Sequence, residues 1–266
     1  MKASTLIGLI IGMLGIAVGA TIEGSQVMAI INPSALLIVL VGTLGATIAG
    51  TSIETVKNIP KLYKKGVSVE PPNLVGRVAE LVGFAEKARR DGLLALDEQL
   101  ATIEDPYTKK GLQLVVDGTD PDLVADVLEA ENDAMRKRHQ AGAQPFEKAG
   151  GYAPTMGIIG TVFGLVHVLA NLAAPETLGP SISSAFIATL LGVSSANVVY
   201  LPVAARLKQL SMQELHFRAM TLEGILAIQA GDNPRVVQEK LMAYVPPAER
   251  PAEGEELKAP AEKAAA

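Results

Sequence analysis

The segment AGGYAPTMGIIGTVFGLVHVLANLAAP, residues 149–175, contains no charged side chain. After the single acid Glu176 a second uncharged segment follows, TLGPSISSAFIATLLGVSSANVVYLPVAA, residues 177–205. A helix needs about 20 predominantly apolar residues to cross the roughly 30 Å hydrocarbon core of a bilayer. Each segment is therefore long enough for one transmembrane helix and too short for two.

The N-terminal part of the chain has the same organisation. Residues 3–22 and 24–53 are uncharged, and only Glu23 separates them. The first segment is longer than the roughly 7–15-residue apolar region of a signal peptide and lacks an Ala-x-Ala cleavage pattern, so we expect it to remain as a span. The sequence thus predicts an all-α integral membrane protein with four transmembrane helices in two hairpins, at about 3–22, 33–53, 149–172 and 181–205.

The charged residues are concentrated in the two remaining segments. Of the 51 charged side chains, 30 lie in residues 54–147 and 17 in residues 206–266. The basic residues nearest the spans follow the second and the fourth span: Lys57, Lys61, Lys64, Lys65, Arg206 and Lys208. Because Lys and Arg close to the ends of spans stay on the cytoplasmic side, we expect both termini and residues 54–147 to be cytoplasmic.

The cytoplasmic segments are predicted to be helical. Apolar residues recur at spacings of three and four over 74–104, with Asp91-Gly92 as a candidate break. A short helix is expected over 107–116, and Asp120-Pro121 starts a helix that leads into the third span. A further helix follows the fourth span, and another starts near Asn233-Pro234.

The resulting organisation has five parts. Residues 1–53 carry the first two spans, 54–147 form a cytoplasmic helical domain, 148–206 carry the last two spans, and 207–245 form C-terminal cytoplasmic helices. Residues 246–266 are rich in Pro, Ala and Glu and have too few apolar side chains to fold, so we expect a disordered tail.

Several classes of function are disfavoured. The absence of cysteine excludes a scaffold built on disulfides. No region is strongly basic, which argues against nucleic-acid binding. The chain has no nucleophile–base pair, no metal-ligand spacing and no phosphate-binding loop, so we expect neither an enzyme nor a cofactor.

The polar groups inside the spans are hydroxyls and backbone carbonyls. The third and fourth spans contain Thr155, Thr161 and Thr189, and Pro154 and Pro202 each free one carbonyl from helical hydrogen bonding. Such hydroxyls commonly bond a carbonyl one turn back, which is the structural alternative. No Asp, Glu, Lys or Arg lies in any span, although membrane ion paths normally use ionisable groups. If these polar groups line an ion path, its carboxylate must come from another subunit, which argues against a self-contained transporter.

Small residues also recur at four-residue spacing in the spans. The pairs are Gly8 with Gly12, Gly15 with Gly19, Gly160 with Gly164, and Gly192 with Ala196. This spacing lets helix backbones approach closely. It fits packing within one subunit and packing between subunits equally well.

A compact set of charges lies in the 54–147 segment. Arg89 and Arg90 precede Asp97 and Glu98, and an unbroken helix would place Arg90 and Asp97 about 20° apart on one face. The charge pattern alone is typical of a solvated helix face.

Four segments carry a resemblance to a known family. They are ARRDGLLALDEQL (88–100), VDG (116–118), RHQAGAQPFEKAGGYAPTMGIIGTVFGL (138–165) and SAFIATLLGVSSANVVYLPVAARL (184–207). Together with the order of spans and cytoplasmic segments, they make residues 1–245 resemble the MotA/PomA family of flagellar motor stator subunits. The resemblance implies an inner-membrane ring of five subunits around a MotB/PomB-type partner, whose span supplies the ion-accepting aspartate. It also implies that ion flow turns the ring and that the cytoplasmic domains push on the rotor protein FliG.

The resemblance also implies roles for particular residues. The two functional prolines of the family fall on Pro154 and Pro202, and its rotor-facing charges fall on Arg89, Arg90 and the acid at Asp97. Many relatives have Glu at that last position, so either Asp97 or the adjacent Glu98 is expected to serve.

The coupling ion is a separate expectation. Thr161 and Thr189 match the threonines of sodium-type members, and hydroxyls with freed carbonyls can replace the water shell of sodium. Sodium coupling with an ion site near Thr161 and Thr189 is therefore favoured, and proton coupling is the alternative. The alternative family assignment is an ExbB/TolQ-type proton channel subunit, which usually has three spans.

Overall fold

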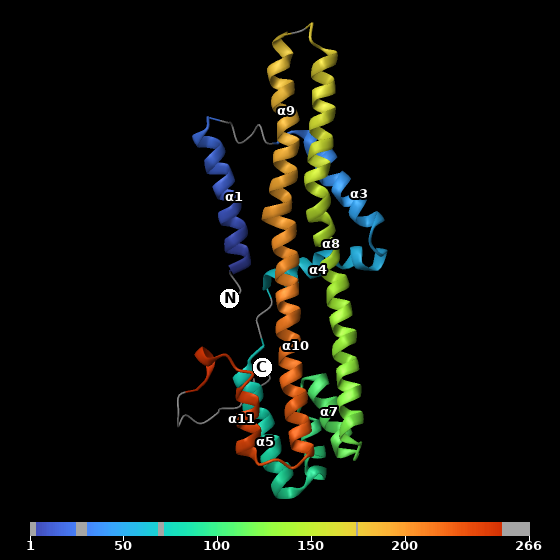
Figure 1. Ribbon diagram of the computed structural model, residues 1–266, viewed down its shortest axis with the longest axis vertical. Helices are drawn as coiled ribbons and strands as arrows, with labels where there is room; N and C mark the ends of the chain where they lie inside the picture. Colours follow the sequence, from blue (N-terminus) through green and yellow to red (C-terminus); the bar gives the residue numbers. More distant parts are fainter. Residues whose placement is uncertain (1–3, 25–30, 69–71, 174, 252–266) are drawn as a thin grey trace. The chain divides into compact units, whose positions relative to one another are not determined.

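The computed structural model describes residues 4–24, 31–68, 72–173 and 175–251 (Figure 1). The described residues contain helices and no strand, which confirms the all-α prediction. The helices before the third predicted span are α1 (Ser4–Ile22), α2 (Pro33–Leu36), the π-helical η2 (Leu37–Val41), α3 (Gly42–Ala49), α4 (Ile53–Ser68), α5 (Leu74–Asp91), the 3-10 helix η3 (Leu93–Leu96), α6 (Asp97–Leu100) and α7 (Pro106–Val116). They are followed by α8 (Pro121–Ala170), α9 (Pro175–Ser194), the π-helical η4 (Ser195–Tyr200), α10 (Leu201–Gln229), α11 (Pro234–Met242) and the 3-10 helix η5 (Pro247–Glu249).

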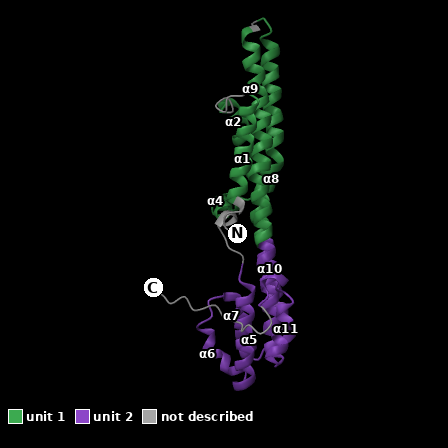
Figure 2. Ribbon diagram, turned by 90° about the vertical axis from the view of Figure 1, so that its left-hand side faces the viewer, with its two compact units in different colours: residues 1–70, 138–210 green, residues 71–137, 211–266 purple. Residues whose placement is uncertain are grey.

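The chain divides into two compact units (Figure 2). Unit 1 comprises residues 1–70 and 138–210, and unit 2 comprises residues 71–137 and 211–266. Helices α8 and α10 each contribute to both units. The predicted spans thus fall in unit 1, and most of the charged segments fall in unit 2.

Unit 1 is apolar on its outside. Its exposed apolar side chains include Ile11 on α1, Leu37 on η2, Phe163 and Leu169 on α8, and Phe186 on α9. Two helical stretches, Pro121–Ala170 and Glu176–Gln229, are long and apolar enough to cross a membrane, and Leu6–Ile22 and Pro33–Ala49 are shorter apolar helices. An apolar exterior of this kind suits a hydrocarbon surrounding rather than water.

The second predicted span ends earlier than expected. Helix α3 stops at Ala49, and Gly50 forms its C-terminal cap. The ammonium of Lys148 on α8 donates a hydrogen bond to the Gly50 carbonyl. A cation at the carboxyl end of a helix interacts favourably with the helix dipole. Lys148 therefore stabilises the carboxyl end of α3.

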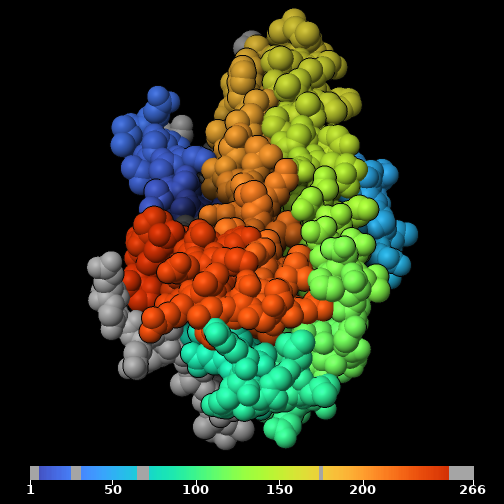
Figure 3. Space-filling view, turned by 60° about the horizontal axis from the view of Figure 1, so that its bottom comes forward, coloured from blue at the N-terminus to red at the C-terminus, as the bar shows by residue number. Residues whose placement is uncertain are grey.

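Unit 2 is built around a buried apolar core from α5, α7, α8, α10 and α11. Tyr107, Leu81, Leu112, Ile225 and Leu241 are among its fully buried side chains. Helix α11 packs on α5, as the red and teal segments of Figure 3 show. Burial raises the pKa of the Tyr107 hydroxyl to about 12, so this group stays neutral.

Local capping signals define the helices of unit 2. Asn73, Asp105 and Asn233 accept hydrogen bonds from backbone amides at the starts of α5, α7 and α11. The predicted starts at Asp120-Pro121 and Asn233-Pro234 are confirmed. The predicted break after Asp91 is also confirmed, because Gly92 has φ +85° and ends α5. Helix α8 then runs without interruption from Pro121 to Ala170, as expected for a helix that leads into the third span.

The predicted tail is only partly within the described residues. Pro247–Glu249 form the short helix η5, and the Arg250 guanidinium donates to the Val245 carbonyl over 2.9 Å. Residues 252–266 of the predicted tail lie outside the described part of the chain.

Candidate functional site

Thr161 and Thr189 meet between α8 and α9. Their Oγ1 atoms are in direct hydrogen-bond contact. Thr161 Oγ1 also lies 3.0 Å from the Ala185 carbonyl oxygen and 3.1 Å from that of Gly157. Thr189 Oγ1 lies 3.4 Å from the same Gly157 oxygen. Two hydroxyl and two carbonyl oxygens from two neighbouring helices thus converge on one half-buried place.

Glycines allow this convergence. A Cβ atom on Gly157 would lie 2.8 Å from the Ala188 carbonyl oxygen, and one on Gly160 would lie 2.6 Å from the Ala188 Cβ. On the facing helix, a Cβ on Gly192 would lie 2.5 Å from the Ala153 carbonyl oxygen. Contacts this short do not occur between real side chains and backbone, so α8 and α9 could not approach this closely with larger residues.

The small-residue pairs therefore divide into two groups. Gly160, Gly164 and Gly192 serve packing within the chain. Gly8, Gly15 and Gly19 have no atom of the described chain within 4 Å of an added Cβ, whereas Gly12 of the same helix packs on Val198. Most of the α1 glycines thus do not serve packing within the described part of this chain.

The oxygen cluster has a defined chemical capacity. Each threonine hydroxyl has one proton, so Thr161 can donate to only one of its acceptors at a time. Backbone and hydroxyl oxygens can replace the hydration shell of a monovalent cation. No group of three or more His, Cys, Asp or Glu side chains suited to a metal ion occurs among the residues that the structure describes. The cluster is therefore neutral. It supplies oxygen ligands, but it contains no carboxylate that could accept a proton.

The other predicted ion-path residues lie further along the same helices. Pro154 and Thr155 precede Thr161 by seven and six residues on α8, or about 10 Å along its axis. Thr155 is exposed and donates to the Tyr152 carbonyl over 2.8 Å. Pro202 lies one residue inside α10, beyond the π-helical turn η4. The structure thus brings Thr161 and Thr189 together and does not bring Pro154, Thr155 or Pro202 into contact with them.

The prolines interrupt hydrogen bonding at defined carbonyls. Pro154 has no N–H, so it leaves the Gly150 carbonyl without its usual partner, and Pro202 does the same for Val198. Val198 lies in η4, and π-helical turns inside longer helices are frequent at functional sites.

The predicted charges of the cytoplasmic segment do not share one helix face. Gly92 breaks the helix, so Arg90 ends α5 while Asp97 starts α6. The expectation that Arg90 and Asp97 lie close together on one face of an unbroken helix is therefore wrong. Arg89, Arg90, Asp97 and Glu98 are nevertheless all exposed on this part of unit 2.

Each of these charges has a different environment. The Arg90 guanidinium donates to Asp91 over 2.9 and 3.0 Å, which raises the pKa of Arg90 and lowers that of Asp91. Glu98 lies 3.5 Å from the Lys87 ammonium. Arg89 and Asp97 form no ion pair with another described residue, so they are the charges most available to a partner.

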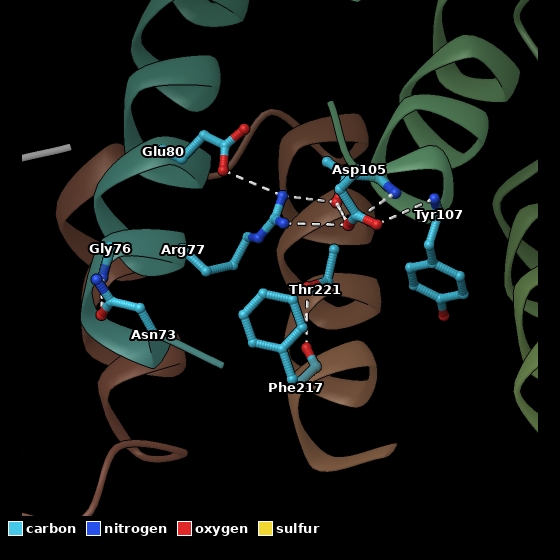
Figure 4. Close-up of polar contacts among 9 residues, drawn as sticks. Asn73, Gly76, Arg77, Glu80, Asp105, Tyr107, Phe217 and Thr221 are labelled. Atoms are coloured by element: carbon cyan, nitrogen blue, oxygen red, sulfur yellow. Dashed lines mark hydrogen bonds and ion pairs between the residues drawn. The ribbon is translucent and has the colours of Figure 1, made fainter. Parts of the chain in front are cut away.

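Sequence reasoning missed a partly buried ion network in unit 2 (Figure 4). The Arg77 guanidinium lies 3.0 Å from Glu80 and 3.1 Å from Asp105, and it donates to Thr108 Oγ1 over 2.7 Å. Its central carbon lies 4.8 Å from the centre of the Phe217 ring, a cation–π contact. Burial raises the pKa of Glu80, and the charge of Arg77 opposes that rise.

The sequence contains one signal for this network, a charged residue on an apolar helix face. Arg77 falls on the apolar stripe formed by Leu74, Val78 and Leu81, where a charged residue must either be exposed or find a buried partner. Asp105 was not among the predicted site residues. Its carboxylate accepts hydrogen bonds from the Tyr107 and Thr108 amides at the start of α7, and it also binds Arg77.

Comparison with known proteins finds relatives that align over most of this chain. Residues 99–220 match the profile of the MotA/TolQ/ExbB proton channel family. "Motility protein A" of Bacillus subtilis (strain 168) is 37% identical over 94% of this chain and 93% of its own length. "Chemotaxis protein PomA" of Vibrio alginolyticus is 33% identical over 92% of this chain and 96% of its own length.

Solved structures agree with these relatives. The structure of C. jejuni MotAB superposes with a TM-score of 0.89, at 31% identity, over 93% of this chain and 97% of that one. The flagellar MotAB stator complex from Bacillus subtilis superposes with a TM-score of 0.87, at 36% identity, over 92% of this chain and 97% of that one. These relatives are motility proteins, although the family profile also includes the TolQ and ExbB proteins. Because these relatives are 33–37% identical over more than nine-tenths of the chain, the chain belongs to the MotA/PomA family of flagellar motor stator subunits.

Proposed function

We propose that this stator subunit forms a cation channel with a MotB/PomB-type partner and converts ion flow into torque on the rotor protein FliG. The observation that carries the proposal is the neutral oxygen cluster of Thr161 and Thr189 in a unit whose predicted spans contain no carboxylate. Such a cluster can pass a cation along but cannot accept a proton by itself. A partner that supplies a membrane aspartate would complete the path, and the related solved assemblies are MotAB complexes.

The proposed setting is the bacterial inner membrane, with four spans and both termini in the cytoplasm. The apolar exterior of unit 1 and its apolar helices support this topology. The open glycines Gly15 and Gly19 of α1 support a ring of several copies, for which the family implies five. Coexpression of the chain with its MotB-type neighbour, followed by counting of subunits in the purified complex, tests the assembly. A monomer that conducts ions alone would contradict it.

Sodium is the proposed coupling ion. Hydroxyl and carbonyl oxygens within 3.0–3.4 Å of one another form a compact ligand set once a cation draws them inward. The test is the swimming speed of cells against external sodium at a fixed proton-motive force. We expect speed to rise with sodium in the unaltered motor and the sodium response to weaken in Thr161→Ala.

A conservative variant separates the ligand role from packing. Thr161→Ser keeps the hydroxyl and removes only a methyl group, so it should keep the sodium response. Swimming speed that does not depend on sodium would exclude sodium coupling and leave the proton. An unchanged sodium response in Thr161→Ala would exclude the role of that hydroxyl.

The exposed charges of unit 2 are the proposed contact with FliG. Arg89 is free of intramolecular ion pairs among the described residues, and Arg90 lies beside it at the end of α5. Charge reversal of both residues to Glu should reduce torque without loss of the protein from the membrane. The control is Arg136→Glu on α8, another exposed arginine. Normal torque of the double reversal would mean that Arg89 and Arg90 are only solvated.

A further inference from the structure

A pocket in unit 1 lies between α1 and the start of α10. Its volume is about 510 Å³. Its walls include residues of α1, of η4 and of α10: Gly8, Gly12, Val198, Pro202, Arg206 and Gln209. A Cβ on Gly8 would meet no atom within 4 Å, so the pocket is wide at that end. The hydroxyl cluster of Thr161 and Thr189 does not contribute to this pocket.

Arg206 is a buried cation in the wall of this pocket. The residue is 8% exposed, and its Nη1 donates to Gln209 Oε1 over 3.0 Å. Its Nε is fully buried and has no hydrogen-bond partner. Among the residues that the structure describes, no carboxylate lies within ion-pair distance of Arg206. A buried charge is costly unless an opposite charge or hydrogen bonds compensate it, so Arg206 lacks an anion.

The chemistry of the walls identifies the class of anion. A guanidinium binds a phosphate through parallel N–H donors, and the Gln209 amide beside it offers further donors. The lining also has apolar parts, Gly8 and Gly12 on α1 and Val198 two turns before Arg206. A ligand with a phosphate next to hydrocarbon satisfies both sides, whereas free phosphate satisfies only the polar side.

We propose that this pocket binds the headgroup phosphate of an anionic phospholipid from the inner leaflet, with the acyl chains along α1. The proposal rests on the proposed topology, in which Arg206 follows the fourth span at the cytoplasmic membrane surface. Basic pockets between spans on that side suit anionic headgroups, which are concentrated there. The lipid would neutralise Arg206 and join the otherwise lightly packed helix α1 to α10.

Lipid retention by the intact assembly tests the proposal. The full chain is purified with its MotB-type partner in detergent, and bound phosphatidylglycerol is counted by native mass spectrometry and titrated from mixed micelles. Removal of a charged hydrogen-bonding group should weaken phosphatidylglycerol binding about tenfold or more in Arg206→Gln. The control Lys57→Gln removes an exposed cation that follows the second span, and it should bind like the unaltered chain.

A second pair of variants leaves Arg206 in place. Gly8→Leu projects a side chain into the pocket and should also reduce phosphatidylglycerol binding. Gly45→Leu on α3 also adds a side chain where an added Cβ meets no atom within 4 Å, but it lies outside the pocket, so it should not reduce binding. This pair keeps the test decisive if Arg206→Gln fails to fold.

Two further probes identify the source of the phosphate. Phosphatidylcholine should bind more weakly than phosphatidylglycerol, and inorganic phosphate at millimolar concentration should not displace the lipid. Displacement by inorganic phosphate would overturn the lipid assignment in favour of a soluble anion. Equal phosphatidylglycerol binding in the unaltered chain, Arg206→Gln and Gly8→Leu would overturn the site altogether. Neither outcome affects the proposed stator function, which is measured separately as swimming speed and torque.

Discussion

Helices α8 and α9 leave no room for even a methyl group at Gly164, and this gives a sharp test of their packing. A Cβ at this position would lie 2.5 Å from the Ala185 Cβ and 2.9 Å from the Ala185 Cα. Optimal separations between carbon atoms are about 3.5–4.0 Å, so the two helices would have to separate by about 1 Å. The Cα atom belongs to the backbone, so no rotation of a side chain relieves the contact.

The expected cost follows from this contact. Overpacking of this kind costs about 1–3 kcal/mol, and the better helix propensity of Ala returns up to about 1 kcal/mol. Gly164→Ala should therefore reduce the free energy of unfolding by about 1–2 kcal/mol. Thr161 lies one turn before Gly164, and Thr189 one turn after Ala185. Separation of the helices should thus also weaken the contact between the two hydroxyls.

The measurement is the thermal midpoint of the purified chain in detergent. For chains of about this size, 1 kcal/mol corresponds to roughly 2–4 °C. The matched control is Gly179→Ala on α9, where an added Cβ meets no atom within 4 Å and the midpoint should stay unchanged or rise slightly. If Gly164→Ala is as stable as Gly179→Ala, the close approach of α8 and α9 at Ala185 is wrong.

Three further predictions concern unit 2. Arg77→Met leaves two partly buried carboxylates without their cation and should cost about 1–3 kcal/mol in chemical unfolding of the full chain, whereas Arg89→Met should cost almost nothing. Burial raises the pKa of Glu80 above its ordinary value of 4.5, so the Glu80 carboxyl binds its proton more tightly in the folded state than in the unfolded state. The contribution of Glu80 to stability therefore falls as the pH rises from 4.5 through the folded-state pKa. Unfolding measured between pH 4.5 and 7 should therefore show a weaker decline in Glu80→Gln than in the unaltered chain; an equal decline would contradict this. Gly92→Ala places a side chain at φ +85° and ψ 163°, a conformation that is essentially restricted to glycine, and should cost about 1–3 kcal/mol. Gly83→Ala, inside α5 with free space around it, should not destabilise the chain in the same assay.

Much of the fold follows from local patterns that a sequence makes visible. The uncharged segments predicted the apolar helices, and Asp120-Pro121 and Asn233-Pro234 predicted the starts of α8 and α11. The break at Gly92 was likewise visible, because a glycine inside a helix costs about 1 kcal/mol relative to alanine. These features depend on interactions within a few residues, which is why a linear sequence contains them.

The candidate site was only partly predictable. Thr161 and Thr189 were named from resemblance, but 28 residues separate them in the chain and only the packing of α8 on α9 brings them into contact. The helix break at Gly92 separated Arg90 from Asp97 and paired Arg90 with Asp91 instead, which a charge pattern drawn on an unbroken helix could not foresee.

The sequence by itself determined which parts of this protein are apolar, where most of its helices start, and that its predicted spans contain no titratable carboxylate. Tertiary structure alone decided which glycines pack inside the chain and which remain open. It alone showed that Arg206 is buried and that Arg77 is partly buried between two carboxylates. The physical reason is distance along the chain. Helix formation and hydrophobicity are set by near neighbours, whereas the surroundings of Arg77 depend on Asp105 and Phe217, which reach it only when separate helices pack.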